Sequence, residues 1–236
     1  MNLKLAYILL TVITTLFLVV IGFKAINDSG INLKKDKMKL IFGLILWQIF
    51  IFEIASTGIL KSYEFPPLFA ITLIVPSFLF TGVFLYRNRN KQWINSIPEQ
   101  WIIYFQSFRV FVEILFVLSL AEGIFNYHVT IEGYNFDMIF ALTAPIVAFL
   151  VYTKKAISRK IILFWNYLGL TVLASVIVLF LTSVYNPEIY GSNVPLLPLV
   201  AMAYPYVLIA GFLMPTAVFL HVLSIIQVKK NTQQGE

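Results

Sequence analysis

Three polar residues whose side chains could do chemistry lie within one of the most apolar stretches of the chain. Gln106, Arg109 and Glu113 are three and four residues apart in the segment FQSFRVFVEIL. In a helix these positions fall within about 60° of one face. An ionised group at mid-membrane costs roughly 2.5–3.5 kcal/mol, so such groups normally face a bundle interior or water. The pattern predicts either a functional site on this face or polar contacts that hold helices together.

The order of the two charged residues in the chain indicates where the partner of Arg109 lies. Arg109 and Glu113 are four residues apart and could neutralise each other within one helix. The order arginine then glutamate is the less favourable one for such a pair. The spacing therefore favours partners for Arg109 on other helices.

Further candidate residues place acids in the outer half of the membrane and neutral polar groups in the inner half. If their faces converge, they line a polar cavity that opens outward. These candidates are Glu53, Glu132, Asn135, Asp137, Asn166 and His221.

Each of these candidates also has a simpler structural interpretation. Asp137 suits a helix N-cap, because aspartate and asparagine are strongly preferred there. Glu132 fits a solvated loop, and His221 fits a hydrogen-bonded helix residue. Glu53 has no basic neighbour on its own helix, so it either pairs with Arg109 or stays protonated through desolvation.

The composition is that of an integral membrane protein. Of the 236 residues, 60% are hydrophobic and only 12% are charged, whereas soluble domains carry about 25% charged residues. Apolar runs of about 20 residues span the hydrocarbon core as helices. The fold class expected is therefore all-α, a polytopic membrane protein that forms one seven-helix domain over residues 1–236 without a soluble domain.

The loops between the apolar runs indicate how the chain threads the membrane. Basic residues concentrate in the first, third and fifth loops and in the C-terminal tail, which by the positive-inside rule places the N-terminus outside and the C-terminus inside. The seven predicted spans are 5–23, 40–60, 68–86, 102–120, 135–152, 161–181 and 203–228.

Several kinds of chemistry are excluded or made less plausible by residue counts. The chain has no cysteine and two histidines, which excludes thiol catalysis and a three-histidine zinc site. No cofactor is expected, and the net charge of +6 is explained by topology rather than by nucleic-acid binding. The expected partners are the lipid bilayer and a small polar solute or ion, with a homo-oligomer left open.

A series of short motifs runs through residues 101–228. In chain order they are Gln106-x2-Arg109-x3-Glu113, Glu132-Gly133-x-Asn135-Phe136-Asp137, Thr143-Ala144-Pro145, Trp165-Asn166 and a late His221. This order resembles a group of uncharacterised bacterial integral membrane proteins with seven spans. The resemblance implies a bacterial inner (cytoplasmic) membrane and adds weight to these polar positions, but it implies no substrate.

Three functions follow from these expectations. The first is a small transporter or channel-like protein with a cavity around the mid-membrane Arg109 and Glu113, in which Arg109 binds an anionic group or gates the path. The second is a membrane sensor or complex subunit whose polar residues are structural. The third is an intramembrane lipid-modifying enzyme, ranked last because no nucleophile motif or metal-ligand set is present, so the sequence favours a protein that is not an enzyme.

Overall fold

The computed structural model describes residues 2–29 and 33–233, and over these residues every regular element is a helix. Within the described ranges, six helices are long and apolar enough to cross a membrane, which makes the chain a multi-pass membrane protein. A shorter apolar helix covers Asp137–Thr153. The six long helices are Leu3–Asp28, Leu33–Ser56, Ala70–Asn88, Glu99–Ala121, Lys160–Tyr185 and Ile209–Asn231.

The long helices contain several breaks and irregular turns, so the elements are more numerous than the spans. In chain order they are α1 (Leu3–Ser29), α2 (Leu33–Ser56), η1 (Ala70–Ile74), α3 (Val75–Asn88), α4 (Trp93–Ser96), α5 (Glu99–Phe105), α6 (Phe108–Ala121), η2 (Tyr127–Val129), α7 (Asp137–Ala148), η3 (Phe149–Thr153), α8 (Lys160–Tyr185), η4 (Pro187–Tyr190), η5 (Leu199–Met202), η6 (Ile209–Leu213) and α9 (Met214–Gln233).

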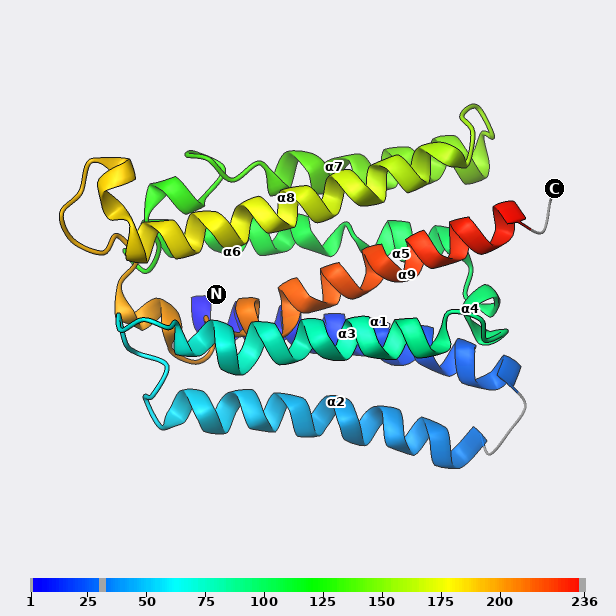
Figure 1. Ribbon diagram of the computed structural model, residues 1–236, viewed down its shortest axis with the longest axis horizontal. Helices are drawn as coiled ribbons and strands as arrows, with labels where there is room; N and C mark the ends of the chain where they lie inside the picture. The colour runs from blue at the N-terminus through cyan, green and yellow to red at the C-terminus, as the bar shows by residue number, and fades with distance from the viewer. Residues whose placement is uncertain (1, 30–32, 234–236) are drawn as a thin grey trace.

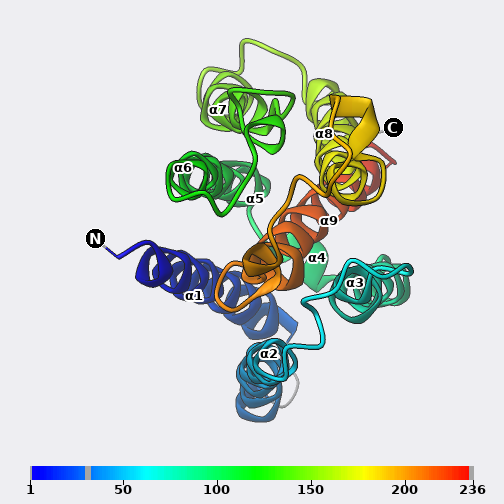
Figure 2. The same cartoon turned by 90° about the vertical axis from the view of Figure 1, so that its left-hand side faces the viewer.

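The helices run lengthwise beside one another, with α9 in the middle of the bundle (Figure 1 and Figure 2). Helix α9 packs against α3, α5 and α8, while α1 packs against α2 and α6. In the α5–α6 and η6–α9 spans, 61% of the most apolar window is buried, against 11% in α2. The protein core therefore lies between α5–α6 and α9, and α2 lies at the rim.

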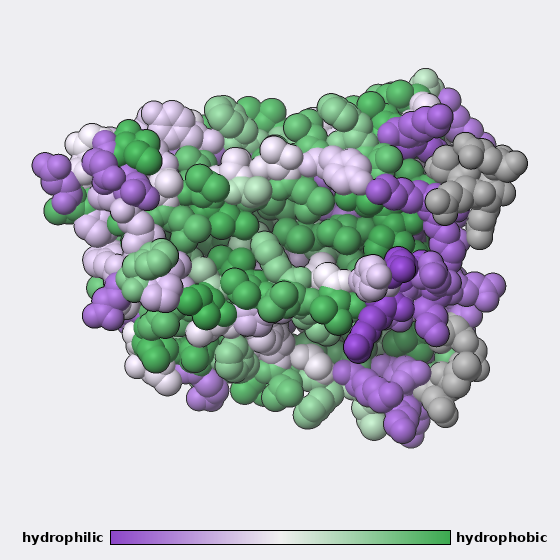
Figure 3. All heavy atoms as spheres, in the orientation of Figure 1, coloured by the Kyte–Doolittle hydropathy of each residue, from purple (hydrophilic) through white to green (hydrophobic). Residues whose placement is uncertain are grey.

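The surface has the pattern that a bilayer requires. Figure 3 shows a broad apolar band, with hydrophilic residues at both ends and most densely at the end where the C-terminus lies. Large side chains such as Phe42, Phe80 and Ile139 are more than half exposed in this band. A soluble monomer rarely exposes so much contiguous apolar surface, so lipid tails are its natural solvent.

The fourth long helix is interrupted close to the candidate arginine. The sequence predicts one continuous span over 102–120, whereas α5 ends at Phe105 and α6 begins at Phe108. At the break the Gln106 and Ser107 amides donate to carbonyls three residues back instead of four. This tighter turn places Arg109 in the first turn of α6, near the middle of the span.

Prolines reshape the last span. The sequence predicts a start at 203, but the apolar helix begins at Ile209, because Pro205 lies in a segment of turns before it. Pro215 lacks an amide hydrogen and so leaves the carbonyl of residue 211 without its usual helical donor. The Trp47 indole of α2 supplies that donor, with Nε1 2.8 Å from the Gly211 oxygen.

Candidate functional site

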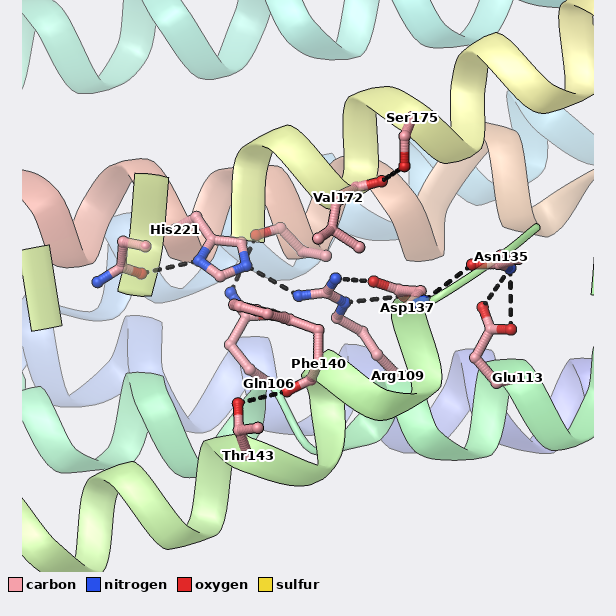
Figure 4. Close-up of polar contacts among 12 residues, drawn as sticks. Gln106, Arg109, Glu113, Asn135, Asp137, Phe140, Thr143, Val172, Ser175 and His221 are labelled. Atoms are coloured by element: carbon pink, nitrogen blue, oxygen red, sulfur yellow. Dashed lines mark hydrogen bonds and ion pairs between the residues drawn. The ribbon is translucent and has the colours of Figure 1, made fainter. Parts of the chain in front are cut away.

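Arg109 is the centre of a buried polar network. Its Nε donates to Oδ2 of Asp137 at 3.0 Å, and its Nη2 forms an ion pair with Oδ1 of the same carboxylate. Its Nη1 lies 2.9 Å from Nε2 of His221. The guanidinium thus joins α6 to α7 and α9 (Figure 4). The expectation that Arg109 finds partners on other helices is confirmed.

The simpler interpretation predicts that the Asp137 side chain caps its helix, but the structure shows no such cap. Asp137 is the first residue of α7, and no side-chain hydrogen bond caps this end from the preceding residue. Its carboxylate turns inward to Arg109, and its backbone amide donates to Asn135 Oδ1 at 2.9 Å. The first residue of α7 therefore supplies the negative charge that neutralises the buried arginine, and Asn135 of the preceding loop holds it in place.

One branch of the network runs from this loop to Glu113. The amide nitrogen of Asn135 donates to both carboxylate oxygens of Glu113, at 3.0 and 2.9 Å, and to the Val129 carbonyl at 3.1 Å. Glu113 is therefore held by an asparagine rather than by Arg109, although both lie on α6. Asn135 links the two acids of the site, Asp137 through its oxygen and Glu113 through its nitrogen.

A second branch runs from His221 to α8. Because a guanidinium has no acceptor, His221 Nε2 accepts from Arg109, and the ring proton is on Nδ1. Nδ1 donates to Asn166 Oδ1 at 2.8 Å. Asn166 Nδ2 donates in turn to Ser224 Oγ at 2.8 Å and to the Ile162 carbonyl. These bonds fix a neutral imidazole and tie α8 to α9.

Aromatic rings wall the centre of the network. Phe140 and Trp165 stack with centroids 4.8 Å apart, and the Trp165 ring lies 5.2 Å from the His221 ring. The guanidinium carbon of Arg109 is 5.2 Å from the Phe140 centroid. Gly169 on α8 leaves the space that the His221 ring fills, since a Cβ there would lie 2.5 Å from Nε2.

Gln106 lies beside the network but is only half satisfied. Its Nε2 donates to the Ala217 carbonyl of α9 at 3.1 Å. Its Oε1 is buried and accepts no hydrogen bond from the described residues. Figure 4 shows this side chain near His221 and Arg109. An unpaired acceptor beside a buried cation is a place where a proton donor on a ligand could bind.

The structure brings together seven of the nine predicted residues and leaves two apart. Gln106, Arg109, Glu113, Asn135, Asp137, Asn166 and His221 are at most 4% exposed. Glu53 is exposed on α2, so it does not pair with Arg109, and Glu132 is exposed in the loop before α7. Instead of lining an outward-opening cavity, the seven residues pack together.

Some members of the site are absent from the sequence predictions. Ser224 ends the branch that runs through His221, and Gly169 and Phe140 shape the space around His221, beside Trp165 of the Trp165-Asn166 motif. Serine and glycine are common in membrane helices, so neither stands out by type. The only signal available is spacing, because Ser224 lies three residues after His221 on the same face of α9.

The donor set does not fit a metal ion. Among the described residues, no group of three or more histidine, aspartate or glutamate side chains is placed to bind one. The carboxylates of the network are occupied by the arginine and asparagine donors described above. The site is therefore built around one guanidinium and its counter-ion.

Comparison with protein-family models, curated proteins and solved structures gives no match for this chain.

Proposed function

We propose that the chain is a small transporter that moves an anionic solute together with a proton and binds the solute at Arg109. One observation carries the proposal: the Asp137 carboxylate takes two donors of a fully buried guanidinium. Arginine binds the carboxylate and phosphate groups of ligands in the same bidentate arrangement. Asp137 therefore occupies the position that an anionic solute would take.

The coupling of the solute to a proton follows from charge balance. A proton on Asp137 removes its negative charge, and Arg109 is then left as a buried cation without a counter-ion. A buried unpaired charge is strongly unfavourable, so a solute anion is drawn to the guanidinium. The unpaired Gln106 Oε1 offers an acceptor for a hydroxyl on that solute. One proton and one anion enter the site together.

The two branches give the site two sides. On one side Glu113 and Asn135 contact the loop before α7. On the other side His221, Asn166 and Ser224 connect α9 to α8. Arg109 is the barrier between them, since a fixed guanidinium repels cations and does not pass protons on. Movement of α7 relative to α9 would expose Arg109 to one side or the other.

The proposal includes a topology and a location. The chain crosses the membrane seven times, with Asp137–Thr153 as the short span, the N-terminus outside and the C-terminus inside. Seventeen residues are at the lower limit for crossing the hydrocarbon core. The basic loops support this orientation. The resemblance to bacterial membrane proteins supports a location in the inner membrane.

Uptake by proteoliposomes tests this proton-coupled transport. The probes are labelled lactate, succinate and inorganic phosphate, with and without an inward proton gradient. We expect proton-stimulated uptake of at least one of them, a loss of more than tenfold in Arg109→Ala, and loss of the proton dependence in Asp137→Asn. Glu53→Gln, which removes an exposed acid on α2, is the matched control and keeps wild-type uptake.

Uptake by Arg109→Ala at the wild-type rate would remove the proposed role of the guanidinium. So would a failure of all three anions to move in the wild type.

A second function is a sensor or complex subunit in which the network is structural. It is favoured because the Arg109 side chain already has protein partners. Each of the three side-chain nitrogens of Arg109 contacts Asp137 or His221. Replacing both partners of a buried pair with apolar residues often preserves stability, whereas removing one is costly. An Arg109→Leu/Asp137→Leu protein that folds, together with a wild type that moves no anion, would support this function instead.

A further inference from the structure

A second polar region lies where α5 and α8 begin and where η3 and α9 end. An open cleft of about 590 Å³ there is lined by polar side chains that include Gln100, Lys155, Arg159 and Asn231. None of the residues of the Arg109 network lines it. This end of the bundle carries the densest hydrophilic surface (Figure 3). The cleft is therefore separate from the proposed transport site.

The floor of the cleft is a carboxylate that is already satisfied. Glu99 is 8% exposed and accepts from the Tyr152 hydroxyl at 2.8 Å and from the Asn231 amide at 2.6 Å. Arg159 forms an ion pair with the same carboxylate. One glutamate is thus neutralised by one arginine, and these contacts fix the four elements around the cleft.

Two cationic side chains of the cleft, Arg159 and Lys155, have nitrogens without a partner among the described residues. The Arg159 side chain is 56% exposed, and only its Nη2 contacts Glu99. Lys155 lines the cleft, and no hydrogen bond or ion pair joins its ammonium to any of the described residues. With Glu99 neutralised by Arg159, the ammonium gives the cleft a net positive charge.

The backbone at Lys155 is unusual for a lysine. Its φ is +52°, and among the described residues it is the one non-glycine position with positive φ. Glycine is the usual residue where a helix ends in this left-handed conformation, because a side chain there is strained. A lysine at this position lowers the stability of the protein, and it places an ammonium at the rim of the cleft.

We propose that this cleft binds the phosphate group of a phosphorylated ligand. Arginine with free N–H groups and a mobile lysine ammonium are the pair of groups that proteins use for phosphate. The phosphate reaches the cleft either as the headgroup of an anionic phospholipid or as a soluble phosphate. The cleft is lined at the starts of α5 and α8 and at the end of α9, which lie at the hydrophilic end of the bundle (Figure 1 and Figure 3). Such an end of a membrane protein meets both lipid headgroups and water.

The test measures binding to the purified full chain. Native mass spectrometry gives the Kd for phosphatidylglycerol, and the shift in Tm measures binding of inorganic phosphate against sodium chloride at equal ionic strength. We expect Lys155→Gly to weaken binding about tenfold, because one charge-assisted contact is lost. The glycine suits the left-handed backbone, so the variant should keep a Tm at least equal to that of the wild type.

The matched control is Lys154→Ala, which removes the same charge from the preceding residue, outside the lining of the cleft. Wild-type affinity in this variant supports a specific site. Binding of phosphatidylglycerol alone identifies a lipid headgroup as the source, and binding of both probes adds a soluble phosphate. The proposal is overturned if neither probe binds, or if the two lysine variants weaken binding equally.

Discussion

The His221 imidazole has a defined partner on every side. Its two nitrogens contact Arg109 and Asn166, and Trp165 covers one part of the ring. Gly169 lies where any side chain would overlap the ring. At the scale of single residues, the position of the imidazole therefore depends on a glycine that makes no hydrogen bond through a side chain.

Gly169→Ala should destabilise the protein by about 1–3 kcal/mol, because added volume in a packed core forces side chains from their positions. The methyl would overlap His221 and lie 2.8 Å from Cε1 of Phe140. Reversible unfolding in detergent measures the change. In the control Gly82→Ala, the added Cβ meets nothing within 4 Å, and the helix should gain roughly 0.5–1 kcal/mol. Equal stabilities of the two variants would contradict the packing described at His221.

The sequence predicts most of this site, and its failures have physical causes. Polar residues such as Arg109, Asn166 and His221 can be found because burying them in lipid is costly. Glu53 has the same signal, yet it lies on the exposed side of α2, because hydropathy does not fix the rotation of a rim helix. The inward turn of Asp137 depends on the Asn135 amide contact, which no spacing rule provides.

At the scale of the elements, α2 is fastened to the core by few contacts. Trp47 donates to the Gly211 carbonyl that Pro215 leaves free, and Gln48 donates to Thr15 of α1 at 2.5 Å. Gly211 also lies against Ile51, whose Cδ1 would be 3.0 Å from an added Cβ. The proline in α9 and the tryptophan in α2 thus form one structural unit.

Trp47→Phe should cost about 1 kcal/mol, because the buried Gly211 carbonyl loses its donor. In a Pro215→Ala background the residue at 215 regains an amide hydrogen that can bond within the helix. The cost of Trp47→Phe should therefore fall towards zero there. A double-mutant cycle from thermal unfolding in detergent measures the coupling. The same cost in both backgrounds would show that Trp47 acts only through packing.

The helix ends could be predicted less well than the helices themselves. The span of α2 is expected from 40 and begins at Leu33, because the charged stretch KKDKMK continues the helix beyond the apolar run. The break at Gln106–Ser107 has no glycine or proline to announce it. Hydropathy records where a chain meets lipid, not where its backbone hydrogen bonds change.

At the scale of the whole molecule, the two ends of the bundle differ in charge. Figure 1 shows the connection between α7 and α8 at the end where the C-terminus lies, and the segment between α8 and η6 at the opposite end. Lys154, Lys155, Arg159 and Lys160 lie at or beside the first of these connections. The proposed orientation places it in the cytoplasm.

Single cysteines can test this orientation, because the chain has none of its own. Ser158 and Asn193 are exposed at the two ends of the bundle. In spheroplasts, a membrane-impermeant maleimide should label Asn193→Cys directly and Ser158→Cys only after permeabilisation. Labelling of both in intact spheroplasts would contradict the topology, and the reverse pattern would invert it.

The neighbouring helices α7 and α8 differ greatly in length. The 26 residues of α8 extend about 39 Å, and the 17 residues of Asp137–Thr153 about 26 Å, at 1.5 Å per residue. A hydrocarbon core is about 30 Å thick, so α8 is longer than the core and Asp137–Thr153 is shorter than it. If the short helix spans the bilayer as proposed, the lipids beside it thin and α8 tilts. In that case Asp137, at the start of the short helix, couples bilayer thickness to its ion pair with Arg109, and we expect long-chain lipids to strain this pair.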